Sequence, residues 1–145
     1  MAREPATTAP AGFAWTDDFL VGIAEIDEQH RGLVDMINGF YAALTGDAPH
    51  REALGALLRG LVDYTKYHFA TEERLMQEAK LPLTRPHLKQ HQEFVQKVGE
   101  MADRFSHGGL VLSVEATSYL RDWLQGHILG TDKHLGRELQ RRGFR

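Results

Sequence analysis

The chain has 145 residues, which suits one domain with a full hydrophobic core. It contains no cysteine, which excludes disulfides, thiolate zinc sites, cysteine-held iron–sulfur clusters and cysteine nucleophiles. Its formal charge of −3 gives no basic field for nucleic acid or an anionic membrane. Without an apolar run of ~18–20 residues or an N-terminal signal sequence, we expect a soluble, cytoplasmic protein.

The N-terminal stretch divides into two parts of different composition. Residues 1–12 are rich in Ala, Pro and Thr, which predicts a flexible tail. Phe13, Trp15 and Phe19 follow without helical spacing, and we expect them to hold an N-terminal arm against the rest of the chain. We therefore predict a single domain over residues 13–145.

Four segments with apolar residues near a spacing of 3.6 predict four helices. They span about residues 27–44, 49–79 and 86–106, and the fourth starts near residue 113 with an apolar pattern that can extend to Leu139. Asp47 and Ser113 are candidate N-caps, and a turn with two prolines separates the second and third helices. Short loops and the lack of strand alternation favour an all-α, antiparallel up-down-up-down four-helix bundle.

Polar side chains interrupt the apolar stripe of every predicted helix. Residues four apart share a helix face. The two side chains of His68/Glu72, and those of His87/His91, can therefore bind the same ligand inside the bundle. Burying several imidazoles and carboxylates without partners is costly, and a cation removes that cost by binding them. The full set is His30 on the first helix, His68 and Glu72 on the second, His87 and His91 on the third, and His127 and Asp132 on the fourth.

The simpler interpretation is that these histidines are hydrogen-bonded core residues, which is the more frequent case for a lone inward histidine such as His30. Two in-phase pairs, together with one histidine on each remaining helix, favour a metal site instead. The other polar candidates receive no role: we assign none to His50, His107 and His134, and we expect Glu28 and Gln29 on the outer face of the first helix.

Imidazole and carboxylate ligands without cysteine suit zinc, iron, manganese or copper. Seven ligands are too many for one tetrahedral zinc ion, and they suit two five- or six-coordinate ions that share the carboxylates. Iron is the natural choice for such a pair in a helix bundle, although ligand type alone leaves manganese open.

The seven residues, spaced as His68-x-x-x-Glu72, His87-x-x-x-His91 and His127-x-x-x-x-Asp132, resemble the ligand signature of the hemerythrins. The flanking sequence is similar to the bacterial branch of that family over roughly residues 13–141. The matching strings are VGIAEIDEQHRGLVDMIN, YHFATEERLM, HLKQHQEF and WLQGHILGTDKH.

The resemblance implies a non-haem di-iron centre, with ferrous ions in the deoxy state and ferric ions in the oxygenated or met state. The implied ligands are His87, His91 and His127 on one iron, His30 and His68 on the other, and Glu72 and Asp132 bridging both. A solvent-derived oxide or hydroxide would form a third bridge. The first iron would then be closed, and the second would keep one open position for O2.

The five-residue spacing from His127 to Asp132 is unusual for two ligands on one helix. On a regular α-helix it turns Asp132 about 140° away from the His127 face. Asp132 can point inward only if the helix loosens. We therefore predict a π-type bulge or a bend around residues 129–131, helped by Gly130.

The implied function is reversible O2 binding by a carrier, store or soluble sensor, and not an enzyme beyond a weak oxidase- or peroxidase-type side activity. Two alternatives use the same centre: a di-iron oxidoreductase that handles peroxide or nitric oxide, and an iron-sequestering or iron-sensing module. An unidentified redox or oxygen-consuming protein is a further candidate partner. Helical phase and the resemblance suggest an apolar O2 pocket, although any bundle core would also want these residues apolar: Leu33, Phe69, Trp123, Leu124 and Ile128.

Overall fold

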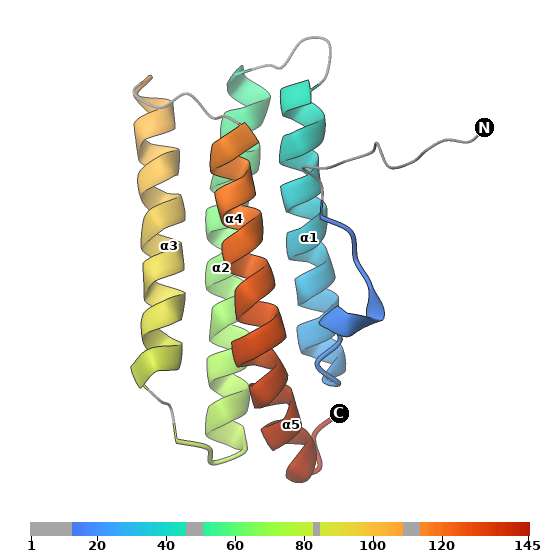
Figure 1. Cartoon of the computed structure of the whole chain (residues 1–145). Helices are drawn as coiled ribbons and strands as arrows, with labels where there is room; N and C mark the ends of the chain where they lie inside the picture. The colour runs from blue at the N-terminus through green and yellow to red at the C-terminus, as the bar shows by residue number, and fades with distance from the viewer. Residues whose placement is uncertain (1–12, 46–50, 83–84, 109–113) are drawn as a thin grey trace, which may run out of the picture.

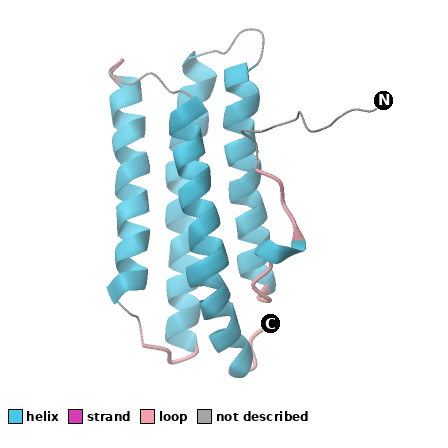
Figure 2. Ribbon diagram, viewed as in Figure 1, coloured by secondary structure: helices cyan, strands magenta, loops and turns pink. Residues whose placement is uncertain are grey.

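The structure is a computed structural model of the whole chain, and it describes residues 13–45, 51–82, 85–108 and 114–145. Four helical rods run antiparallel, and no strand occurs in the described ranges (Figures 1 and 2). The rods are α1 (Ala24–Thr45), α2 (Arg51–Glu78), α3 (Arg85–Ser106) and a fourth made of α4 (Val114–Gly126), η3 (His127–Asp132) and α5 (Lys133–Arg141). The predicted all-α bundle is thereby confirmed. None of the described helices is both long and apolar enough to span a bilayer.

The predicted start of the first helix differs from the observed one, because α1 begins at Ala24 rather than near Asp27. The Asp27 carboxylate accepts hydrogen bonds from the backbone N–H groups of Val21 (2.7 Å) and Gly22 (3.2 Å). Asp27 therefore ties the preceding loop to the first turn from inside the helix. The two predicted N-caps, Asp47 and Ser113, lie outside the described residues.

The N-terminal arm lies against the bundle, as expected from its aromatic residues. Phe13 and Phe19 are buried with their ring centroids 5.3 Å apart, and Trp15 packs beside them. The backbone N–H of Phe13 donates to the side-chain oxygen of Asn38 on α1 (2.8 Å), and the Asn38 amide donates back to the Phe13 carbonyl (3.0 Å). The predicted tail, residues 1–12, lies outside the described residues.

The fourth rod changes its helical winding next to the polar cluster. η3 is π-helical, and the backbone N–H of Lys133 donates to the carbonyl of Ile128, five residues earlier, as well as to that of Gly130. Bonding to the fifth preceding residue brings residues five apart onto adjacent turns of one face. The predicted π-type bulge is confirmed, and it covers His127–Asp132 rather than only residues 129–131.

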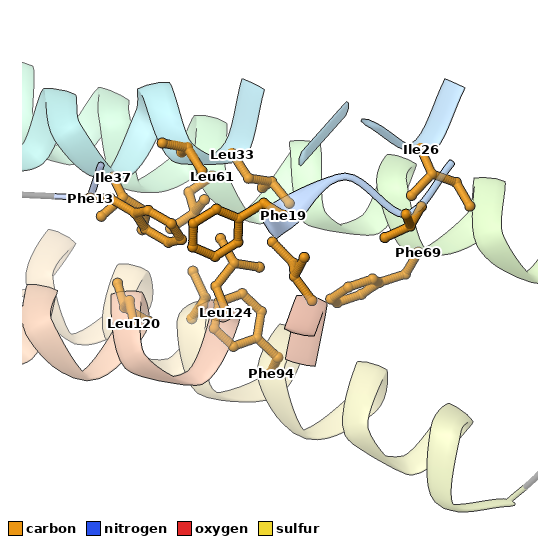
Figure 3. Close-up of a cluster of buried hydrophobic side chains, with 14 of the residues drawn as sticks. Phe13, Phe19, Ile26, Leu33, Ile37, Leu61, Phe69, Phe94, Leu120 and Leu124 are labelled. Carbon is orange, nitrogen blue, oxygen red and sulfur yellow. The ribbon is translucent and has the colours of Figure 1, made fainter. Parts of the chain in front are cut away.

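Apolar side chains from all four rods fill the interior. Figure 3 shows Leu33, Ile37 and Leu61 of α1 and α2 pointing into the space that Leu124 of α4 and Phe94 of α3 enter from the other side. Each of these side chains is at most 2% exposed. Full burial of such a side chain contributes roughly 1.5–3 kcal/mol, so this core provides the framework that holds the polar cluster.

Candidate metal centre

The structure brings all seven predicted site residues together in one half of the bundle. This half contains the start of α1, the end of α2, the start of α3 and η3. All seven side chains are buried, and the most accessible, His87, is only 8% exposed. The seven are His30, His68, Glu72, His87, His91, His127 and Asp132.

The possible ligand atoms form two groups, and the atoms of each group lie within 4.8 Å of one another. We call them the three-histidine group (His87, His91, His127) and the two-histidine group (His30, His68). Glu72 and Asp132 belong to both groups. The cluster can therefore hold two ions side by side, with two carboxylates shared between them.

Glu72 directs its two carboxylate oxygens to different groups. Oε1 lies 3.0 Å from Nε2 of His91 and 3.3 Å from Nε2 of His87. Oε2 lies 3.0 Å from Nε2 of His68 and 3.5 Å from Nε2 of His30. A carboxylate placed in this way can bind one ion with each oxygen.

Asp132 divides its oxygens in the same manner. Oδ1 lies 3.2 Å from Nε2 of His127 and 3.7 Å from Nε2 of His87, both in the three-histidine group. Oδ2 lies 3.0 Å from Nε2 of His30 in the two-histidine group. This placement depends on η3, because regular α-helical winding would turn the carboxylate away from His127.

Strong electrostatic coupling links the buried carboxylates and imidazoles. Burial opposes protonation of His30, but hydrogen bonds and charges from Asp132 and Glu72 outweigh it and raise the pKa of His30 from 6.5 to about 9. Burial also opposes ionisation of Glu72, but His68, His30 and His87 hold the pKa of this carboxyl well below its usual value. The cluster therefore favours an ionised carboxylate with positive charge around it.

Unpaired polar atoms test whether the residues fit metal ions. Among the described residues, five buried polar atoms of the cluster have no hydrogen-bond partner: His30 Nδ1, His68 Nε2, Glu72 Oε2, His127 Nε2 and Asp132 Oδ1. A buried polar group without a partner costs about 1–3 kcal/mol. Four of these atoms also belong to the contacts described above, where they approach one another without hydrogen-bond geometry. Lone pairs that converge in this way fit bound cations.

Three side chains outside the seven hold histidine rings by their Nδ1 atoms. Nδ1 of His68 lies 2.8 Å from Oε1 of Gln29, and Nδ1 of His127 lies 2.6 Å from Oε1 of Gln90. Nδ1 of His91 lies 3.0 Å from Oε2 of Glu73. Partners of this kind orient a histidine that binds a metal ion and make its other ring nitrogen a stronger electron donor to the metal.

The orientation of Gln29 fixes the tautomer of His68. The hydroxyl of Thr71 donates to the Tyr67 carbonyl (3.2 Å), so it must accept the bond from Nε2 of Gln29 (3.1 Å). The amide oxygen of Gln29 then faces His68, whose Nδ1 carries the proton. In the neutral ring, Nε2 of His68 then keeps a lone pair directed at the cluster.

The prediction that Gln29 lies on the outer face of the first helix is wrong, because its side chain is only 4% exposed. Gln29 lies three residues after Ile26 and four before Leu33, and this spacing places it on the inward face. That signal was present in the sequence. Glu73 and Gln90 carried no comparable signal, because each is defined only by its contact with another helix. Glu28 is exposed as expected.

Two of the three histidines without a predicted role, His107 and His134, do not join the cluster. His107 is exposed and its ring hydrogen-bonds the Asp103 carbonyl (2.8 Å). His134 is exposed on α5. The side chain of His50 lies outside the described residues.

Of the five residues predicted to line an O2 pocket, two pack on rings of the cluster and three are buried in the core. The ring of Phe69 stacks on that of His91 with centroids 3.9 Å apart, and its centroid lies 5.5 Å from that of His68. The half-buried ring of Trp123 stacks on His127 at 4.8 Å. Leu33, Leu124 and Ile128 are at most 1% exposed. Phe69 thus touches both groups, whereas Trp123 stacks on the three-histidine group.

Comparison with known proteins agrees with this geometry. Residues 21–139 match the family model "Hemerythrin HHE cation binding domain". A bacteriohemerythrin of Stenotrophomonas maltophilia (strain R551-3) is 40% identical over 119 residues, which cover 82% of this chain and 76% of the relative. Myohemerythrin-1 of Phascolopsis gouldii is 29% identical over 123 residues, covering 85% and 91%.

A solved structure has the same fold. The crystal structure of a wild-type hemerythrin superposes with a TM-score of 0.81 at 29% identity, covering 88% of this chain and 97% of the other. The family match, the sequence relatives and the buried cluster able to hold metal ions agree with one another. The chain therefore belongs to the hemerythrin family.

Proposed function

We propose that this protein reversibly binds O2 at a pair of iron ions held by the seven clustered residues. The proposal is carried by the way the two carboxylates face both groups. Glu72 and Asp132 each direct one oxygen to the three-histidine group and the other oxygen to the two-histidine group. When bound, such an iron pair supplies the two electrons that O2 takes up. The family match supports the choice of metal and ligand.

The unequal groups support a position for O2. The three-histidine group offers five ligand atoms with the carboxylates, and the two-histidine group offers four. The position with fewer protein ligands has more room for an added ligand, so we place O2 beside His30 and His68. Glu72 and Asp132 would keep the two positions at a fixed separation.

The apolar residues around the cluster would keep water away from bound O2. We propose Leu33, Phe69, Trp123, Leu124 and Ile128 for this lining. Phe69 contacts rings of both groups, so it can close the side between α2 and α3. A lining that excludes water slows the irreversible oxidation of the iron pair. Slow irreversible oxidation distinguishes an O2-binding protein from an oxidase.

We propose a carrier, store or sensor rather than an enzyme. Nothing in the described contacts favours turnover of peroxide or nitric oxide, or release of the metal as cargo. The cytoplasmic location, the extent of the domain over residues 13–145 and a redox or oxygen-consuming protein partner stay predictions from the sequence.

The test is to load metal-free protein with iron(II) without air, admit air, and then purge with inert gas. We expect two iron ions per chain and an absorption band that appears with air and fades on purging, over repeated cycles. His68→Ala should lose the cycle, and the control His107→Ala, which changes an exposed histidine outside the cluster, should keep it. One iron per chain, or irreversible oxidation in the first cycle, would contradict the proposal.

A further inference from the structure

The two histidine groups have different partners on their outer side. In the three-histidine group, Nδ1 of His91 faces the carboxylate of Glu73 and Nδ1 of His127 faces the amide oxygen of Gln90. In the two-histidine group, among the described residues, Nδ1 of His68 faces only the amide oxygen of Gln29, and Nδ1 of His30 has no hydrogen-bond partner. An extra negative charge therefore stands behind one group only.

The contact between Glu73 and His91 strengthens a metal ligand in two ways. An ionised carboxylate can only accept hydrogen bonds, so Nδ1 of His91 carries a proton, and in the neutral ring Nε2, 3.0 Å from Glu72, is the nitrogen left to bind a cation. The negative charge also makes the imidazole a stronger donor. The amide oxygens of Gln29 and Gln90 fix the tautomer in the same way but add no charge.

The position of the His91 ring does not depend on Glu73 alone. The ring stacks on Phe69 with centroids 3.9 Å apart and planes 5° from parallel. Glu73 is 36% exposed and borders a groove of about 350 Å³ between α2 and α3. Replacing the carboxylate by an amide of the same shape can therefore remove the charge while the ring stays in place.

We infer that Glu73 makes the three-histidine group the tighter metal site, so that two divalent cations load in a fixed order. The three-histidine group fills first, and the two-histidine group fills second. Two differences act in the same direction. The three-histidine group has one more histidine, and among the described contacts it alone has a carboxylate at an Nδ1 atom, that of Glu73 at His91. This inference rests on the two-ion site of the proposed function and assigns Glu73 as a positioning residue.

The experiment is a titration of metal-free protein with Co²⁺ under anaerobic conditions, followed by calorimetry and by visible absorption. We expect two separate steps of one ion each. Glu73→Gln removes the charge and can keep the hydrogen bond, so it should weaken the first step by about 10-fold, the low end of the range for mutation of an outer partner of a metal-bound histidine, and leave the second nearly unchanged. The matched control Glu93→Gln changes an exposed carboxylate on α3, 4.0 Å from Lys89, and should leave both steps unchanged.

A second readout separates charge from loss of structure. With one equivalent of Co²⁺, the proton on Nδ1 of His91 should give a paramagnetically shifted NMR signal, and Glu73→Gln should move that signal. The converse variant Gln29→Glu places a carboxylate behind His68. It should reduce the difference in Co²⁺ affinity between the two binding steps. Calorimetry of Glu73→Gln alone decides the matter if Gln29→Glu does not fold.

The outcomes distinguish this inference from the proposed function. If wild-type protein binds two ions and Glu73→Gln titrates like wild type, the inference is overturned and the proposed function stands. If one equivalent of Co²⁺ distributes evenly between the groups, the fixed order is overturned. If wild-type protein binds fewer than two ions, the two-ion site itself is refuted and the proposed function fails with it.

Discussion

The bundle has two halves with different interiors. Toward the end of α1 and the start of α2 the interior is apolar, with Ile37, Phe40, Leu58 and Leu61 fully buried. Toward the end of α2 and the start of α3 the same rods bury five imidazoles and two carboxylates. The apolar half stabilises the fold without any ligand. The polar half leaves buried atoms unpaired, so its stability depends on what it binds.

The largest expected effect is that of metal removal on the polar half. A ligand that binds only the folded state at about 1,000 times its Kd stabilises it by about 4.1 kcal/mol. At roughly 2–4 °C per kcal/mol for a chain of about 150 residues, the loaded protein should melt about 10 °C higher than the metal-free protein. Thermal unfolding with and without a chelator measures this difference. Equal melting temperatures would show that the polar half is stable without ions.

A cavity in the apolar half should cost nearly as much without affecting the metal. Leu58 is fully buried, and Leu58→Ala should lower the free energy of unfolding by about 2–5 kcal/mol through lost burial and the cavity left behind. The loss should be similar in metal-free and loaded protein, and two ions per chain should still bind. Denaturant unfolding combined with metal counting checks both. A variant that folds but binds one ion or none would show that the halves are coupled.

The smallest of the expected changes in metal chemistry, a change of rate only, is expected at Leu124. Its cost in stability should resemble that of Leu58→Ala, because both leucines are buried. Leu124→Ala should let water approach the cluster and speed the loss of the oxygenated form several-fold. Leu120 lies one helical turn earlier on α4, is equally buried, and belongs to the apolar side, so Leu120→Ala is the matched control. Absorption spectra recorded over time give the two rates. A Leu124→Ala rate equal to wild type would remove Leu124 from the proposed lining.

Helical periodicity made the fold and six of the seven residues predictable, whereas Asp132 only adjoined the inward face of the fourth helix. The spacing of 3.6 assigns every residue of a long amphipathic helix to a face, so polar residues in phase with leucines are expected inside the bundle. The same geometry showed that Asp132 is out of phase with His127, and only a change of winding could reconcile the two. η3 is that change.

Contacts between helices were not predictable, because spacing along one helix says nothing about what the neighbouring helix presents. Gln90 of α3 meets His127 of η3, and Gln29 of α1 meets His68 of α2. The start of α1 was misplaced for a related reason, since Asp27 bonds to the loop before the helix. These contacts set tautomers and charges, which the sequence alone leaves undefined.

The sequence by itself determined four rods, their inward faces and the residues that meet in the polar half, because periodicity is a local property of the chain. Only the tertiary structure decided which oxygen of Glu72 and of Asp132 faces which histidines, and that Glu73 stands behind His91. Those features depend on the register and rotation of the helices, which are set by packing over the whole bundle.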